Sequence, residues 1–300
     1  MFEKTISNEQ MIFPCGMSRS GTTLLTTVLD SHSQISLGYE LLPAELPPTK
    51  EVISNLEEAA SEFGGNDLVS IGKILRKKGF NAEGLFAVRV ARSGIEYEGY
   101  VSLLKDSIDN GYEKIKSVVD RFRISYEVVA WKASKEDAAI SGFKMNNASY
   151  NLALKLFPNS YYIYILRDPR DVWVSHIKRN FKKTVTDVCD AWITFAENFV
   201  KFSEKHPDIA RLIRYEDLVT TPVDVINNMF SILPVEVESS VYEFYKSNAT
   251  VHRAGHPNSE QLSQDFFTSS IGNWKDTIKN EDRLIIEKKC GDIMKKHDYL

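Results

Sequence analysis

Two segments of the sequence combine cations and hydroxyl groups at spacings that suit anion binding. The first, residues 16–23, reads GMSRSGTT and places Arg19 between two glycines that are five residues apart. Such glycines allow a tight turn, and the free N–H groups of a following helix attract phosphate. Thr22 stands where nucleoside-triphosphate loops require lysine, which disfavours a magnesium–ATP or GTP site. By itself the segment suits either a phosphate site or a turn that only caps a helix.

The second segment, residues 167–183, is strongly basic. It carries six Lys and Arg and two Asp, a net charge of +4, whereas the rest of the chain carries −8. Its arginines and hydroxyls could converge on a phosphate through bidentate contacts. The alternative is a solvated amphipathic helix with ordinary ion pairs, for example between Arg170 and Asp171.

Alternating strands and helices would bring the two segments together. Short apolar runs predict strands, and longer amphipathic stretches predict helices. Asp168 is the predicted N-cap of the basic helix, and Pro169 is its first residue. This alternation indicates an α/β fold with a central parallel sheet flanked by helices. The predicted strands are 11–15, 139–144, 161–166 and 211–214, and the clearest predicted helices are 21–31, 51–63, 68–78, 149–157, 169–183 and 185–205.

The ends of the predicted strands are where a ligand would bind. Arg167 follows a buried strand, at the edge of the sheet where open α/β folds bind ligands. Ser175 and Arg179 are four residues apart on the following helix and therefore share a face. Two anion sites at neighbouring strand ends imply a ligand with two phosphate groups.

Composition and length limit the class of protein. The 300 residues are 43% hydrophobic with a net charge of −4, which excludes a generally basic nucleic-acid binder. No apolar run approaches the roughly 18–20 residues of a membrane span, and no signal peptide is evident. Cys15, Cys189 and Cys290 are scattered, so we expect neither disulfides nor a structural metal, and a cytoplasmic protein. We expect one domain over 1–300, in which 41–135 form a helical insertion after the first strand–helix unit.

Taken together, the two segments resemble the PAPS-dependent sulfotransferases, whose donor is 3′-phosphoadenosine 5′-phosphosulfate (PAPS). The family loop G-x-x-[R/K]-S-G-T-T matches residues 16–23, and its R-D-x-R-x-x-x-x-S-x-x-x-R segment matches residues 167–179. The likeness is best to the tyrosylprotein-type, carbohydrate-type and bacterial branches and covers about a quarter of the chain. It implies the P-loop-like sulfotransferase fold, related to that of P-loop nucleoside-triphosphate hydrolases. Further similar segments are 30–40, 156–168, 213–219 and 271–275.

The resemblance also implies a reaction. Sulfuryl transfer from PAPS to an acceptor hydroxyl or amine proceeds by in-line attack and requires no metal. Glu40 aligns with the glutamate that serves as general base in part of the family, although the neighbouring Tyr39 replaces a residue that is often acidic. His32 is the other candidate base, but a histidine at a helix end more often caps or packs. Arg19 would stabilise the departing oxygen, and Lys144, which lacks the proline usual soon after it, would contact the transferring group.

The remaining expectations concern binding. Residues expected to hold the nucleotide, which leaves as adenosine 3′,5′-bisphosphate (PAP), are Arg19, Ser20, Gly21, Thr22, Thr23, Arg167, Ser175, Arg179, Tyr215, Ser270 and Trp274. Residues of the insertion that could line an acceptor pocket, or equally be core or surface, are Arg89, Arg92, Tyr97, Tyr100 and Trp131. A kinase-like phosphotransferase and a non-catalytic nucleotide-binding protein remain as alternatives. The identity of the acceptor and the oligomeric state stay open.

Overall fold

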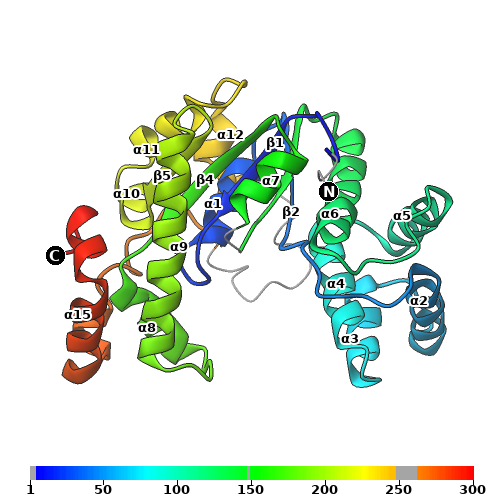
Figure 1. Ribbon diagram of the computed structural model, residues 1–300, viewed down its shortest axis with the longest axis horizontal. Helices are drawn as coiled ribbons and strands as arrows, with labels where there is room; N and C mark the ends of the chain where they lie inside the picture. Colours follow the sequence, from blue (N-terminus) through cyan, green and yellow to red (C-terminus); the bar gives the residue numbers. More distant parts are fainter. Residues whose placement is uncertain (1–4, 147–148, 248–261) are drawn as a thin grey trace.

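A five-stranded parallel sheet forms the centre of the computed structural model, which describes residues 5–146, 149–247 and 262–300 (Figure 1). The strand order is β2-β3-β1-β4-β5, and every neighbouring pair is parallel. The strands are β1 Met11–Cys15, β2 Ile35–Gly38, β3 Ile140–Phe143, β4 Ser160–Leu166 and β5 Ala210–Arg214. The predicted α/β class with a central parallel sheet is confirmed.

Helices cover both faces of the sheet, which explains why its strands are nearly continuous apolar runs. The helices outside the insertion are α1 Thr22–Asp30, α7 Tyr150–Leu156, α8 Pro169–Lys178, α9 Val185–Lys205, α10 Tyr215–Thr220, α11 Pro222–Phe230, α12 Ser239–Tyr242, α14 Trp274–Thr277 and α15 Asn280–Lys296, with a 3-10 turn at Phe244–Lys246. None of the helices in the described ranges combines the length and the apolar composition that a bilayer crossing needs.

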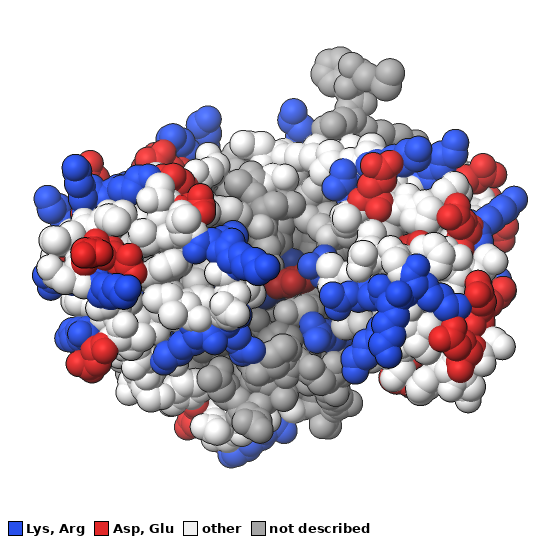
Figure 2. Space-filling model, turned by 90° about the horizontal axis from the view of Figure 1, so that it is seen from below, with Lys and Arg blue, Asp and Glu red and all other residues white. Residues whose placement is uncertain are grey.

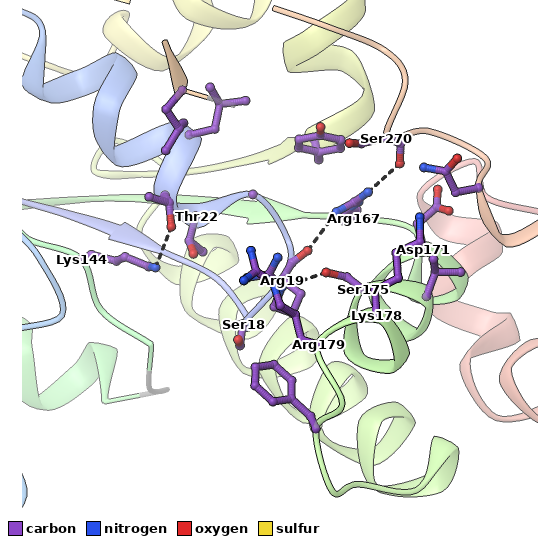
Figure 3. A pocket seen from close by; sticks show the side chains of 18 of the residues that line it. Ser18, Arg19, Thr22, Lys144, Arg167, Asp171, Ser175, Lys178, Arg179 and Ser270 are labelled. Atoms are coloured by element: carbon purple, nitrogen blue, oxygen red, sulfur yellow. Dashed lines mark hydrogen bonds between the residues drawn. The ribbon is translucent and has the colours of Figure 1, made fainter. Parts of the chain in front are cut away.

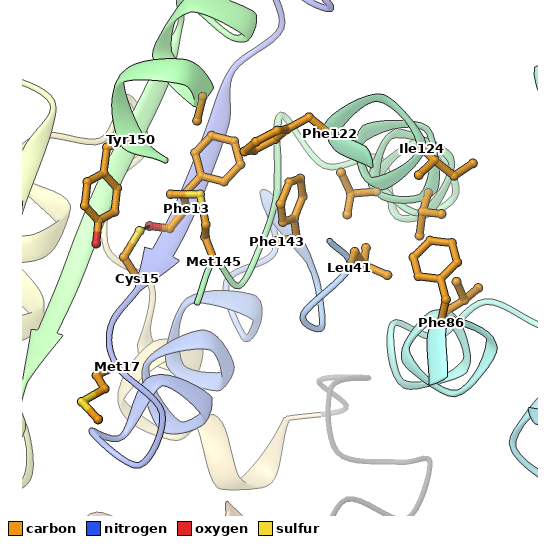
Figure 4. Close-up of a cluster of buried hydrophobic side chains, with 14 of the residues drawn as sticks. Phe13, Cys15, Met17, Leu41, Phe86, Phe122, Ile124, Phe143, Met145 and Tyr150 are labelled. Carbon is orange, nitrogen blue, oxygen red and sulfur yellow. Dashed lines mark hydrogen bonds between the residues drawn. The ribbon is translucent and has the colours of Figure 1, made fainter. Parts of the chain in front are cut away.

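Successive residues of β1 point to opposite faces of the sheet, as the twofold period of a strand requires. Ile12 packs in the hydrophobic cluster that α1, α10 and α11 cover. Its neighbour Phe13 packs in the second cluster, with side chains of α7, α9 and the insertion. Phe13 meets Phe143 edge-to-face at 5.1 Å between ring centroids, and Phe122 of the insertion lies beside them (Figure 4). The second cluster therefore joins the insertion to the sheet.

The insertion is helical, as predicted, and its helices gather beyond the β2 edge of the sheet (Figure 1). Lys132 of the insertion contacts the β2 edge of the sheet. Its buried ammonium donates to Asp30 Oδ1 and to the Leu37 carbonyl, each at 2.9 Å. These two acceptors belong to α1 and β2, so the insertion is anchored to the first strand–helix–strand unit. The helices are α2 Thr49–Phe63, α3 Leu68–Lys77, α4 Asn81–Arg92, α5 Tyr97–Asp109 and α6 Val118–Glu136.

Two predictions about elements are wrong. The insertion was predicted to follow the first strand–helix unit directly. It follows β2 instead, a four-residue edge strand (Ile35–Gly38) that was not predicted. The basic helix ends at Lys178 instead of residue 183, since Asn180 adopts a left-handed conformation (φ 52°) that an α-helix cannot continue through. Its start is confirmed, because Asp168 is the N-cap and accepts from the Arg170 N–H at 2.8 Å.

Candidate functional site

A cavity of about 660 Å³ opens at the carboxyl ends of β1 and β4 (Figure 3). From β1 the chain runs towards β2 at one edge of the sheet, and from β4 it runs towards β5 at the opposite edge. Open α/β sheets bind their ligands at such a switch point. All predicted site residues except Ser20 and Trp274 line this cavity: Arg19, Gly21, Thr22, Thr23, Glu40, Lys144, Arg167, Ser175, Arg179, Tyr215 and Ser270.

The loop between β1 and α1 has the shape of an anion cradle. Gly21 is the N-cap of α1 in a left-handed conformation (φ 95°), and no side chain caps the helix. A Cβ at Gly21 would lie 2.5 Å from Tyr215 Cδ2, so only glycine fits. Ser20 does not line the cavity, but its hydroxyl is buried with no hydrogen-bond partner in the described residues. The N-terminus of α1 therefore remains available to an anion.

Three arginines from separate elements meet at this loop. Arg19 Nε donates to Ser175 Oγ at 2.8 Å, and Arg167 Nη1 donates to the Arg19 carbonyl at 3.1 Å (Figure 3). Burial, and then the positive charges of Arg179 and Arg167, lower the pKa of Arg19. Among the described residues, no carboxylate lies within ion-pairing distance of Arg19 or Arg167. A bound anion would offset this repulsion.

Residues 270–274 contact Arg167, which follows β4, and Asp171, which lies in α8. Arg167 Nη2 donates to the Ser270 carbonyl at 2.6 Å, and its guanidinium lies 4.4 Å from the centre of the Tyr215 ring. Asp171 accepts from the N–H groups of Gly272 (2.7 Å) and Trp274 (3.0 Å). The structure therefore places the backbone carbonyl of Ser270 against the guanidinium of Arg167.

Trp274 does not line the cavity, whereas Tyr215, the other aromatic residue predicted to hold the nucleotide, does. The ring of Trp274 stacks on the guanidinium of Arg170, with 3.8 Å between Cζ and the ring centre. Arg170 pairs with Asp168 at 2.8 Å and with Glu287 at 3.0 Å. The suggested pair between Arg170 and Asp171 is wrong, because Asp171 accepts backbone N–H groups instead.

Glu40 lines the cavity and has a left-handed backbone conformation (φ 45°). Its Oε1 accepts from Lys144 Nζ at 2.8 Å and from Asn146 Nδ2 at 2.7 Å, and its Oε2 is 3.5 Å from Arg89. Burial raises the pKa of Glu40, but Lys144 and then Arg89 outweigh it and lower the pKa to about 2. Lys144 also donates to Thr23 Oγ1 at 3.2 Å, so it links Glu40 to the anion cradle.

His32, the other candidate base, does not line the cavity. Its Nδ1 accepts from the Gln34 N–H at 3.0 Å, and its Nε2 lies 2.7 Å from the Glu236 carbonyl, to which it donates. Both ring nitrogens of this buried histidine are therefore engaged in structural contacts.

A second cavity of about 270 Å³ adjoins the first and shares Glu40 and Lys144 with it. Arg89 lines this small cavity and Arg92 lines the large one, whereas Tyr97, Tyr100 and Trp131 line neither. Four further residues line the cavities and were not predicted as site residues: Tyr39, Arg121, Asn146 and Asp171. Only Asp171 had a local signal, as an acid in the matched basic segment.

Comparison with known proteins shows the family of this chain. A sequence model of a protein family, described as "Sulfotransferase family", matches residues 11–239. A protein of Aquifex aeolicus (strain VF5), described only as uncharacterized, is 25% identical over 278 residues, which are 89% of this chain and 31% of that protein. The chain thus spans about a third of that relative's length.

Two solved structures share the fold. One is the sulfotransferase domain from the Synechococcus PCC 7002 olefin synthase, with a TM-score of 0.62, 17% identity and 95% of each chain covered. The other is a sulfotransferase domain from the curacin biosynthetic pathway, with a TM-score of 0.56, 21% identity, and 93% of this chain and 97% of that one covered.

Proposed function

The chain belongs to the sulfotransferase family, and from that premise we propose that it transfers the sulfuryl group of PAPS to an acceptor hydroxyl or amine. One observation carries the choice of donor. Arg19 and Arg167 lie at the ends of adjacent parallel strands, beside an uncapped helix N-terminus and without a carboxylate partner among the described residues. Two such anion sites in one cavity suit a nucleotide with phosphate groups at two positions.

The residues of the cavity divide between the two ends of the donor. The loop from Arg19 to Thr23 would bind the 5′-phosphosulfate through the N-terminus of α1 and through hydroxyl groups, including that of the buried Ser20. Arg167, Ser175 and Arg179 would bind the 3′-phosphate, and Tyr215 would pack on the nucleotide. When bound, PAPS supplies a sulfuryl group attached to a phosphate leaving group. Arg19 would stabilise the charge that develops on that phosphate.

Glu40 would accept the proton of the acceptor. Its pKa of about 2 makes it a weak base while it is paired with Lys144. Lys144 also reaches Thr23 in the anion cradle, so it is placed to share its charge with an anion bound there. Sharing that charge weakens its hold on Glu40 and makes the carboxylate more basic. The cations of the chain would supply the positive charge that phosphoryl transferases take from Mg²⁺.

Ligand-dependent melting tests the nucleotide assignment. PAP should raise the melting temperature by mass action, whereas Mg–ATP should change it little. A larger rise with Mg–ATP would contradict the proposal and favour the kinase-like alternative. Transfer of labelled sulfate from PAPS to any member of a hydroxyl and amine panel would then distinguish an enzyme from a non-catalytic nucleotide-binding protein.

A further inference from the structure

We propose that the acceptor carries an anionic group, a carboxylate or a phosphate, which Arg89 and Arg121 bind in the small cavity beside Glu40. The inference rests on the proposed function and adds a substrate class to it. It follows from where the small cavity lies, from its charges and from its size.

The small cavity lies where an acceptor must enter. It meets the large cavity at Glu40 and Lys144, which line both. A molecule in the small cavity therefore presents its reacting atom to Glu40 while the large cavity holds the donor. Asn146 donates to Glu40 at 2.7 Å through its amide nitrogen, which leaves its buried Oδ1 without a hydrogen-bond partner in the described residues. That oxygen can accept a hydrogen bond from an acceptor hydroxyl or amine.

The charges that line the small cavity are unbalanced. Arg89, Arg121 and Lys144 face a single carboxylate, that of Glu40, which Lys144 holds at 2.8 Å. Arg89 lies farther from Glu40, at 3.5 Å, and also donates to the Leu42 carbonyl at 3.2 Å. The lining thus retains a net positive charge that an anion would compensate.

Arg121 is the clearest indication of a ligand. No carboxylate among the described residues pairs with it, and its contact with the Lys116 carbonyl is long, at 3.4 Å. Its Nε is buried without a hydrogen-bond partner there, but so is that of Arg123 on the same helix, and what distinguishes Arg121 is its place in the cavity lining. Arg89 and Arg121 line the small cavity but not the large one, so the donor does not account for them. Lys and Arg side chains gather along both sides of the hollow in this face of the molecule (Figure 2).

The size and the other walls of the cavity limit what the acceptor can be. Its volume is about 270 Å³, less than half that of the large cavity at about 660 Å³. Leu42, Pro43 and Val118 supply apolar wall beside the arginines. The site therefore suits a short hydroxylated or aminated acid, whose anionic group lies only a few atoms from the group that is sulfated.

Binding of small anions with the donor site filled tests this inference. With PAP at saturation, we would titrate malonate, inorganic phosphate and the neutral malonamide by calorimetry into the wild type, Arg121→Gln and Arg123→Gln. Arg123 is the matched control, because it lies on the same helix but stacks on Tyr112 and lines neither cavity. Malonate and phosphate compare a carboxylate with a phosphate as the anionic group.

We expect at least one anion to bind the wild type and Arg123→Gln at least about 10-fold more tightly than malonamide. Arg121→Gln should lose about 10-fold in affinity for that anion, as expected for one charged hydrogen bond. Equal binding of malonamide and both anions, or anion binding that Arg121→Gln leaves unchanged, would overturn the inference. If PAP binds normally in that case, the proposed function survives. Failure of PAP itself to bind would overturn both.

Discussion

The carboxylate of Glu40 and the ammonium of Lys144 lie 2.8 Å apart, although 104 residues separate them in the sequence. Glu40 follows the edge strand β2, and Lys144 follows β3, which pairs with β2 in parallel. Their contact thus arises because neighbouring parallel strands end at the same edge of the sheet. Both residues line both cavities, so the pair marks the point at which the proposed donor and acceptor meet.

Replacing Glu40 with glutamine should strongly reduce turnover but preserve nucleotide binding. Glutamine cannot accept a proton, and a general base contributes about 10²–10⁴-fold to rate. We expect kcat for transfer of the labelled sulfuryl group to decrease by about 10²–10⁴-fold, while the Kd for PAP changes by less than about threefold. Glu45→Gln, at an exposed carboxylate of the same segment, is the control. Undiminished turnover would place the base elsewhere.

The depressed pKa of Glu40 predicts how stability depends on pH. Its pKa falls from 4.5 to about 2 on folding, so the stabilisation it provides is complete above pH 4.5 and is lost as the pH falls towards 2. Between pH 4.5 and pH 2, the free energy of unfolding of the wild type should fall by up to about 1.4 kcal/mol per pH unit more than that of Glu40→Gln. Urea denaturation of both proteins at pH 6 and pH 3.5 measures the difference. If the free energy of unfolding changes equally in both proteins between these pH values, Glu40 is not ion-paired in solution.

Replacing Arg167 with alanine should remove discrimination for the 3′-phosphate. A charged hydrogen bond is worth about 1.5–3 kcal/mol, so we expect affinity for PAP to fall about 10–100-fold. Affinity for adenosine 5′-monophosphate should change much less. Arg211→Ala, on the neighbouring strand and outside the cavity lining, is the matched control. An equal loss for both nucleotides would contradict the assignment of Arg167 to the 3′-phosphate.

An alanine at Gly21 should disturb both the cradle and the fold. Its left-handed backbone (φ 95°) costs a side chain about 1 kcal/mol, and the Cβ would also meet the Tyr215 ring at 2.5 Å. Gly64→Ala isolates the first effect, since Gly64 is also left-handed (φ 74°) but has nothing within 4 Å of an added Cβ. We expect Gly21→Ala to lower the free energy of unfolding by about 1–3 kcal/mol more than the control. Equal losses would mean that the ring moves aside freely.

Asp171 should act on nucleotide binding through the backbone that it holds. Asp171→Ala leaves the N–H groups of Gly272 and Trp274 without their acceptor and frees the segment whose Ser270 carbonyl contacts Arg167. We expect the Kd for PAP to rise about 10-fold, as for one lost hydrogen-bonding group. Hydrogen exchange at residues 272 and 274 should accelerate.

The control for Asp171 is Asp224→Ala, at an exposed acid that likewise lies in the first turn of its helix. If exchange at 272 and 274 accelerates while the affinity for PAP stays unchanged, the segment contributes nothing to nucleotide binding.

Much of the fold could be predicted because buried parallel strands and capped helices leave local signals. β1 and α9 have the predicted bounds, and Asp168 and Pro169 start α8 as expected. β2 was missed because it is only four residues long and its pairing with β3 depends on residues more than one hundred positions away. The end of α8 was missed because asparagine at position 180 fits a helix or a left-handed turn equally well in the sequence.

By itself, the sequence singled out the two segments proposed to bind anions, because the type and spacing of their residues are local properties. Only the tertiary structure decided which cations remain available to a ligand. Arg170 and Arg167 lie three residues apart, yet Arg170 is paired with Asp168 and with Glu287 from α15, while Arg167 faces the cavity. Arg121 had no recognisable signal and became a candidate through its place beside Glu40. Ion pairing depends on distances that the folded chain sets, and sequence spacing does not specify them.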